Sequence, residues 1–124
     1  MRKKKLCAVL LAFLPTLPLL SQASGNHQAQ VAEHSRLAQQ YLNQHRPDLA
    51  IPEFQALVTL EPRNLDAQAN LGVLLFFQGD YAKAEPHLRT ALDLQPNLTK
   101  IQALLGMAEK RTGETENAES EIFN

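Results

Sequence analysis

Apolar residues recur at helical spacing through most of the chain after residue 30. In the middle of the chain, one such stretch runs from about Asp66 to Gln78 and a second follows Gly79, with Ala84, Leu88, Ala91 and Leu92 at the i, i+4, i+7, i+8 spacing of a buried stripe. Gly79 is expected to stop the first helix, and Asp80 to cap the second. Pro96 then ends the second helix. The pattern predicts a hairpin of two amphipathic helices.

The hairpin pattern repeats along the chain at one fixed offset, a 34-residue period. Shifting the chain by this offset aligns four sets of residues: Leu37 with Leu71 and Leu105; Ala50 with Ala84 and Ala118; Phe54 with Leu88 and Ile122; and Pro62 with Pro96. Pro52 and Pro86 recur in the same way inside the second helices, and so belong to the repeat geometry. The chain is therefore predicted to be an all-α solenoid with units at residues 31–64, 65–98 and 99–124, the last incomplete.

Small residues recur where the two helices of a unit are expected to meet. Gly72 follows the repeated leucine of the first helix, and Ala84 begins the buried stripe of the second. Small side chains let two helices approach closely while large ones fill the spaces between them. A bulky residue at either position should overpack the contact.

The amino-terminal segment, from Met1 to Ala23, differs from the rest of the chain. A basic start, Arg2 to Lys5, precedes an apolar run from Leu6 to Leu20, and Ser21-Gln22-Ala23 carries small residues where a signal peptidase cuts. The segment is predicted to be a signal peptide, residues 1–23, cleaved after Ala23, with residues 24–30 as a linker. An uncleaved membrane anchor is the alternative. The mature protein is then expected to be exported, either periplasmic or secreted.

Removal of this segment would change the chemistry of the chain. Cys7 would be lost with it, leaving no disulfide, thiolate ligand or cysteine nucleophile. Eight Lys and Arg would remain against thirteen Asp and Glu, a net charge of −5. An acidic chain without a basic stripe argues against nucleic-acid binding.

These residues resemble the tetratricopeptide repeat (TPR) family, which has a 34-residue unit. The middle unit carries the most complete pattern: Leu71, Gly72, Gly79, Tyr81, Ala84, Leu88, Ala91 and Pro96. The first unit has His45 at the turn glycine, the third has Glu109 at a large apolar position, and no unit has the family's early Trp, with His34, Gln68 and Gln102 in its place. The resemblance implies a scaffold of stacked hairpins that binds other proteins.

No catalytic, cofactor-binding or metal-binding set is recognisable. His27, His34, His45 and His87 lack metal-ligand spacing and are expected to be solvent-exposed. Gly-rich phosphate loops and Ser-His-Asp sets are also absent. Asn97-Leu98-Thr99 is a formal glycosylation acceptor only if the source is eukaryotic. The chain is therefore not expected to be an enzyme.

The resemblance places a partner-binding groove on the concave face, which the first helices of successive units line. The residues expected there are Gln39, Leu42, Asn70, Val73, Phe77, Lys100 and Met107, together with Ser35 and Ala103. Asn70 and Lys100 also match positions of a carboxylate-binding clamp known in the family, whereas Ser35, Gln39 and Leu104 do not. Helical phase puts Phe77 on the concave face, and Phe76 at its edge nearer the next unit.

Three functional hypotheses follow. The first is an exported scaffold that binds a protein or peptide segment in the groove. The second is the amino-terminal part of a larger repeat-containing enzyme or secretion component. The third is self-association through an open carboxy-terminal end, because the incomplete last unit leaves its apolar face uncovered.

Overall fold

The computed structural model describes the backbone of residues 19–122 and the side chains of residues 23–122. These residues form five helices: α1 (Leu19–Asn43), α2 (Pro47–Leu60), α3 (Leu65–Phe77), α4 (Tyr81–Leu94) and α5 (Thr99–Ile122). No strand occurs within this range, so this part of the chain is all-α, as predicted. Most of the predicted signal peptide, with Cys7 and the part of the apolar run up to Pro18, lies outside the described residues.

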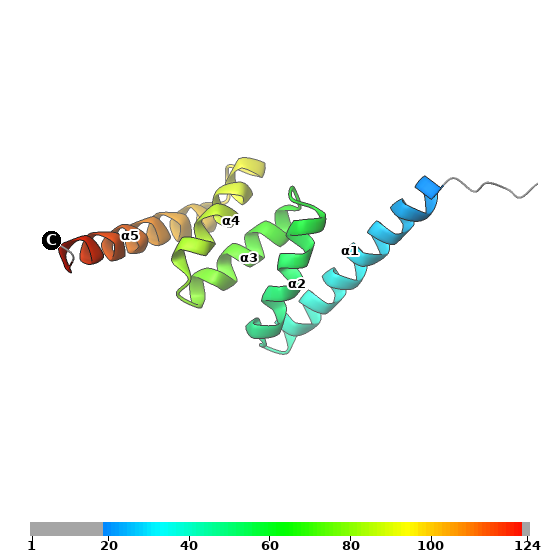
Figure 1. Ribbon diagram of the computed structural model, residues 1–124, viewed down its shortest axis with the longest axis horizontal. Coiled ribbons are helices and arrows are strands. Elements are labelled where there is room, and N and C mark those ends of the chain that lie inside the picture. The colour runs from blue at the N-terminus through cyan, green and yellow to red at the C-terminus, as the bar shows by residue number, and fades with distance from the viewer. Residues whose placement is uncertain (1–18, 123–124) are drawn as a thin grey trace, which may run out of the picture.

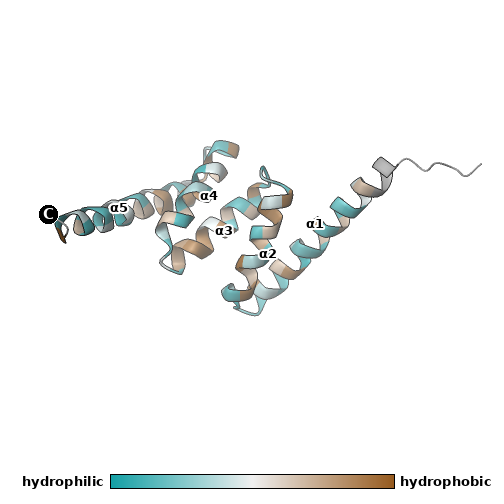
Figure 2. Cartoon of the chain, in the orientation of Figure 1, coloured by the Kyte–Doolittle hydropathy of each residue, from teal (hydrophilic) through white to brown (hydrophobic). Residues whose placement is uncertain are grey.

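Consecutive helices fold back on each other in a zigzag, with α1 at one end and α5 at the other (Figure 1). α1 packs on α2, α2 on α3, α3 on α4 and α4 on α5. Figure 2 shows hydrophobic residues along α2, α3 and α4, whereas the outer half of α5 is mostly hydrophilic. Each interior helix buries an apolar stripe against a neighbour on either side, which is the arrangement of a solenoid.

Each hairpin turn contains one residue in the left-handed region. Gly79, between α3 and α4, has φ +85°, and His45, between α1 and α2, has φ +55°. Gly79 therefore ends α3 as predicted, without the steric cost that Cβ imposes on His45. Asp80 occupies the N-cap position of α4, but its side chain makes no capping hydrogen bond, contrary to the prediction.

Two helices, α3 and α4, approach each other closely at Gly72. A Cβ atom added to Gly72 would lie 2.8 Å from Leu88 Cδ2 and 3.1 Å from the Leu88 backbone nitrogen. Leu88, Ala84 and Ala91 of α4 are completely buried in this contact. The predicted small-residue contact is confirmed, and the absence of a side chain at Gly72 sets the spacing of α3 and α4.

At the start of α3 and of α5, the first helices of the second and third units, side-chain hydrogen bonds fix the loop that joins each unit to the one before it. Asn64 caps α3, since its Oδ1 accepts a hydrogen bond from the Ala67 backbone N–H at 3.0 Å. Gln68 donates from Nε2 to the Pro62 carbonyl at 2.7 Å, and one period later Gln102 donates to the Pro96 carbonyl at the same distance. The two loops are thus closed by the same contact.

Two segments differ from the sequence prediction. Residues 24–30 belong to α1 instead of forming a linker; they contain no proline that would break the helix. α5 continues through Gly113 as one helix, where a turn and a second helix of the third unit were expected. After Ala108 no residue of α5 is buried, so the expected second helix of the third unit does not pack back on the first.

Candidate binding groove

The polar part of the groove lies between the second half of α1 and the first half of α3. A pocket of about 360 Å³ is lined by Ser35, Gln39, Phe54, Leu57, Asn64, Asp66, Ala67 and Asn70. Phe54 and Leu57 of α2 are buried, and the remaining lining residues are mostly polar. We call this the polar pocket.

Several polar groups of the polar pocket are already bonded within the chain. Asn70 donates from Nδ2 to the Asp66 carbonyl at 2.8 Å, and Gln39 donates to Asn43 at 3.3 Å. The Asn70 side-chain oxygen and the Asp66 carboxylate remain as acceptors. The residues that line the pocket include Asp66 and no cation, so it cannot act as a carboxylate-binding clamp.

The apolar part of the groove lies at the turn end of the same two helices. A pocket of about 310 Å³ is lined by Leu42, His45, Arg46, Pro47, Leu74, Phe77 and Gln78. The Phe77 side chain is 76% exposed. Hydrogen bonds from Arg46 to Asp48, the shorter at 2.7 Å, lower the pKa of the Asp48 carboxyl and keep this guanidinium occupied. We call this the Phe77 pocket.

Phe76 and Phe77 point in different directions, as helical phase predicts. The Phe76 ring is half-buried and packs edge-on against Tyr81 of α4, with ring centroids 5.2 Å apart. The two phenylalanine rings meet edge to face at 5.5 Å. Phe76 therefore joins the core and holds the base of the Phe77 ring, whose outer face has no partner in the described chain.

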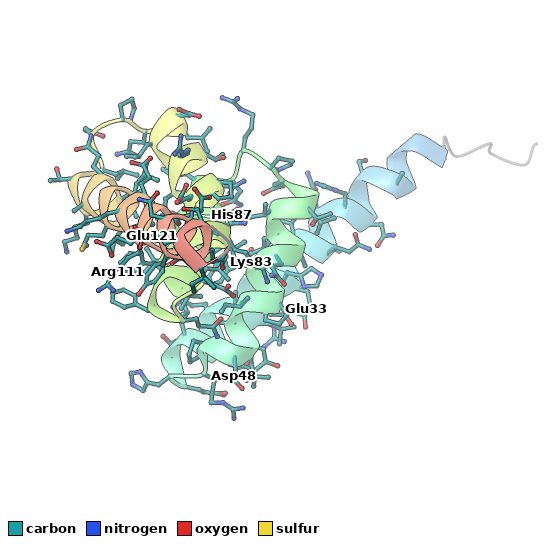
Figure 3. The ribbon with its side chains drawn as sticks, turned by 60° about the vertical axis from the view of Figure 1, so that its left-hand side comes forward. Glu33, Asp48, Lys83, His87, Arg111 and Glu121 are labelled. Atoms are coloured by element: carbon teal, nitrogen blue, oxygen red, sulfur yellow. The ribbon has the colours of Figure 1, made fainter. Side chains whose placement is uncertain are left out.

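A third pocket, of about 600 Å³, follows along α5. It is lined by Phe76, Tyr81, Met107, Lys110, Arg111 and Glu114. The Arg111 guanidinium, labelled in Figure 3, lies within cation–π range of the Tyr81 ring, 5.9 Å from its centre. This pocket combines an aromatic wall with two cations.

The predicted groove residues are thus divided among three pockets. Gln39 and Asn70 meet in the polar pocket, Leu42 and Phe77 in the Phe77 pocket, and Met107 lies in the third. Val73 and Lys100 line none of these pockets. Sequence reasoning missed Leu74, Tyr81 and Arg111, although Arg111 stands one 34-residue period after Phe77 and could have been found in that way.

The histidines were wrongly expected to be uniformly exposed. His34 Nδ1 lies 2.6 Å from Glu53 Oε2, and His87 Nδ1 lies 2.8 Å from Gln68 Oε1. Both rings are half-buried between the helices of their hairpins, and burial lowers the pKa of His87. These pairs connect helices and do not form a metal site; no group of three potential metal ligands occurs among the residues described.

The sequence matches the tetratricopeptide repeat family over residues 35–99 and 74–124. A DnaJ homolog subfamily C member 7 homolog from Schizosaccharomyces pombe is 30% identical over 86 residues, which are 69% of this chain and 18% of that protein. The chain therefore spans less than a fifth of this relative.

Solved structures show the same fold. A structure of MamA is 26% identical and superposes with a TM-score of 0.63, covering 81% of this chain and 55% of that one. A MamA mutant is 27% identical, with a TM-score of 0.61, over 71% of this chain and 64% of that one. The TPR-containing domain of a Plasmodium falciparum FK506-binding protein is 19% identical, with a TM-score of 0.62, over 88% and 70%; this last similarity concerns the fold alone. The chain belongs to the tetratricopeptide repeat family.

Proposed function

We propose that this chain is an exported, non-catalytic scaffold that holds a segment of another protein in the groove along α1 and α3. The Phe77 ring carries the proposal, because it is 76% exposed beside the apolar side chains of Leu42 and Leu74. Burying a phenylalanine side chain contributes about 1.5–3 kcal/mol. A partner that covers Phe77 would gain this free energy.

The two ends of the groove suggest what the bound segment offers. An apolar side chain would fill the Phe77 pocket, and hydrogen-bond donors would meet the free acceptors of Asn70 and Asp66 in the polar pocket. In peptide recognition, a buried apolar anchor typically supplies most of the affinity, and polar groups fix the orientation of the bound segment. TPR folds are generally used for such interactions, which supports the proposal.

Affinity capture from the native compartment tests the groove. Phe77→Ala is expected to lose proteins that the wild type captures, and Lys100→Ala tests whether the groove extends to α5. Leu49→Ala is the matched control, since Leu49 is an exposed apolar residue of α2 at 36% exposure, outside the three pockets. Equal capture by the wild type and both groove variants would refute binding in the groove.

Export is a separate part of the proposal. It is supported by the basic start, the apolar run and the small residues before Ser24. Among the described helices, none has the length and apolar character that crossing a membrane requires. Amino-terminal sequencing of the protein from its native cells is expected to begin at Ser24. A chain that begins at Met1 in the cytoplasm would refute export.

A second candidate is that these repeats are one part of a larger enzyme or assembly component. It is favoured by the length of the Schizosaccharomyces pombe relative, of which the matched region is 18%. The reading frame after Asn124 in the native gene distinguishes the two candidates. Further repeats or a catalytic domain in frame would support the second.

A further inference from the structure

A row of aromatic rings joins the Phe77 pocket to the third pocket. The Phe77 ring meets the Phe76 ring at 5.5 Å between centroids, and Phe76 meets Tyr81 at 5.2 Å. The Arg111 guanidinium follows, 5.9 Å from the centre of the Tyr81 ring. A peptide of about six extended residues, at about 3.3 Å each, is long enough to span all three steps. A segment anchored at Phe77 can therefore reach Arg111.

The groove changes from aromatic to cationic between the second and third units. One 34-residue period after Phe76 and Phe77 stand Lys110 and Arg111. Both cations line the third pocket together with Met107, which is 48% exposed. The part of the groove that follows Phe77 thus combines apolar surface with two positive charges.

Arg111 has no carboxylate partner within the described residues. Arg36, Arg46 and Arg89 lie 2.8, 2.7 and 2.7 Å from a carboxylate oxygen. In the same part of the chain, the Arg111 side chain makes no ion pair or hydrogen bond and lies over the Tyr81 ring instead. The N–H groups of a guanidinium lie in its plane, so contact with a ring leaves them available to an acceptor.

Lys110 is held only weakly. Its Nζ lies 3.8 Å from Glu114 Oε1, and both side chains are exposed. An exposed pair of this kind contributes little to stability, so Lys110 can bind a ligand instead at little cost. With Lys110, Arg111 and Glu114, the pocket carries one more cation than anions. This charge fits a single carboxylate, whereas a phosphate group carries about −1.5 to −2 at neutral pH.

The aromatic wall of the third pocket strengthens the attraction of its cations for a carboxylate. Phe76 and Tyr81 are half-buried and form one side of the pocket. A ligand against these rings loses water on that side, and charge-assisted hydrogen bonds are stronger where water is excluded. The net charge of the whole chain is negative, so this pocket is a local exception. Its charge is complementary to an acidic segment and not to a basic one.

We propose that the segment held in the groove carries an Asp or Glu within about five residues of its apolar anchor, and that Arg111 and Lys110 bind this carboxylate. The partner is then an acidic segment of another protein, with its anchor in the Phe77 pocket. The inference rests on the function proposed above. Neither cation stands at a position of the carboxylate-binding clamp, and the carboxylate comes from a side chain inside the segment.

Selection from a display library of random dodecapeptides on the purified chain tests the proposal. Peptides that bind the wild type are expected to combine an apolar residue with Asp or Glu within about five residues. Selection on Arg111→Gln should lose the acidic residue and keep the apolar one, whereas selection on Phe77→Ala should lose the apolar one. Apolar enrichment without acidic residues would overturn the acidic partner and leave the function proposed above intact. No enrichment on the wild type would refute both.

A double-mutant cycle then measures the contact itself. Fluorescence anisotropy compares a selected peptide with its Glu-to-Gln form, on the wild type and on Arg111→Gln. Either change alone should raise the Kd about tenfold or more, and the two together no further. Arg111 is exposed, so the variant should fold. Arg63→Gln is the matched control, since Arg63 is also exposed and lines none of the three pockets; it should bind both peptides like the wild type. Losses that simply add would overturn the contact.

Two further measurements distinguish other occupants of the third pocket. Phosphoserine in place of the peptide's acidic residue should bind no more tightly, because Glu114 opposes its additional charge; tighter binding would overturn the choice of a carboxylate. The last turns of α5, from Glu119 to Ile122, also combine acidic and apolar side chains. Sedimentation of the wild type should show a monomer of 13.8 kDa. A dimer that Arg111→Gln abolishes would identify a second copy as the occupant and overturn the assignment to another protein.

Discussion

Gly72 and Gly106 provide a matched pair for testing how the helices of a unit are spaced. The two glycines stand one period apart on equivalent faces of α3 and α5, but only Gly72 is covered. An alanine Cβ at Gly72 would lie 2.8 Å from the Leu88 side chain and 3.1 Å from its backbone nitrogen. Leu88 is completely buried, so it cannot move aside without disturbing its neighbours. Overpacking of this kind costs about 1–3 kcal/mol.

The helix itself gains from either substitution. Replacing glycine by alanine inside a helix contributes about 1 kcal/mol. Gly72→Ala should therefore lower the free energy of unfolding by about 0–2 kcal/mol, whereas Gly106→Ala, which meets no atom within 4 Å, should raise it by about 1 kcal/mol. The predicted difference between the variants is about 1–3 kcal/mol.

Thermal unfolding followed by circular dichroism measures this difference. One kcal/mol shifts the Tm of a domain with about 100 residues by about 4–8 °C. A Tm for Gly72→Ala that equals or exceeds that of Gly106→Ala would refute the conclusion that Gly72 sets the helix spacing.

Three other predictions concern single residues. Asn64→Ala removes the cap of α3 and should cost about 1 kcal/mol in urea unfolding, whereas Asp80→Ala, whose side chain makes no capping bond, should cost clearly less; equal losses would contradict the assignment of the caps. His45→Gly should raise the free energy of unfolding by about 1 kcal/mol, because φ +55° is costly for a residue with Cβ; a lower value would show that the ring itself stabilises the turn. Burial lowers the pKa of His87 in the folded chain, so below pH of about 6.5, the ordinary histidine value, the unfolded chain binds more protons. The stabilisation is then fully present above that pH and lost as the pH falls further. Urea unfolding followed from neutral pH down to about pH 5 should show a steeper loss for the wild type than for His87→Gln; parallel curves would contradict it.

Local pattern predicted the two hairpins well, because their signals are local. Leu71, Ala84 and Leu88 recur at helical spacing, and Gly79 meets a backbone requirement that few other residues can meet. The structure of the segment after Gly113 could not be predicted from the local pattern in the same way. Glycine costs about 1 kcal/mol inside a helix, so the sequence permits either a turn or a continuous helix. The choice depends on what packs on Gly106 and Ile122, which the local pattern does not show.

The groove was predicted as one surface, whereas the structure divides it into pockets of different chemistry. Helical phase assigns residues such as Phe77 to a face. It does not show that α2 supplies Phe54 and Leu57 to the polar pocket, or that Arg46 is held by Asp48. The first contact joins residues from different helices, and the second pairs a side chain for which the hydrophobic pattern predicts no partner. They appear only once the helices are placed.

The absence of the family's early Trp has a structural counterpart in the polar pairs of the first two units. Where a tryptophan would fill the hairpin with apolar area, Gln68 is only 4% exposed and must satisfy both ends of its amide. Its nitrogen donates to the Pro62 carbonyl, so its oxygen is left as the acceptor, and His87 must then carry its proton on Nδ1. One side chain thereby connects the loop before α3, the start of α3 and the middle of α4. In the first unit, the pair of His34 and Glu53 connects α1 and α2 at the same positions. Gln102, one period later, is exposed and within the described chain has only the bond to its loop.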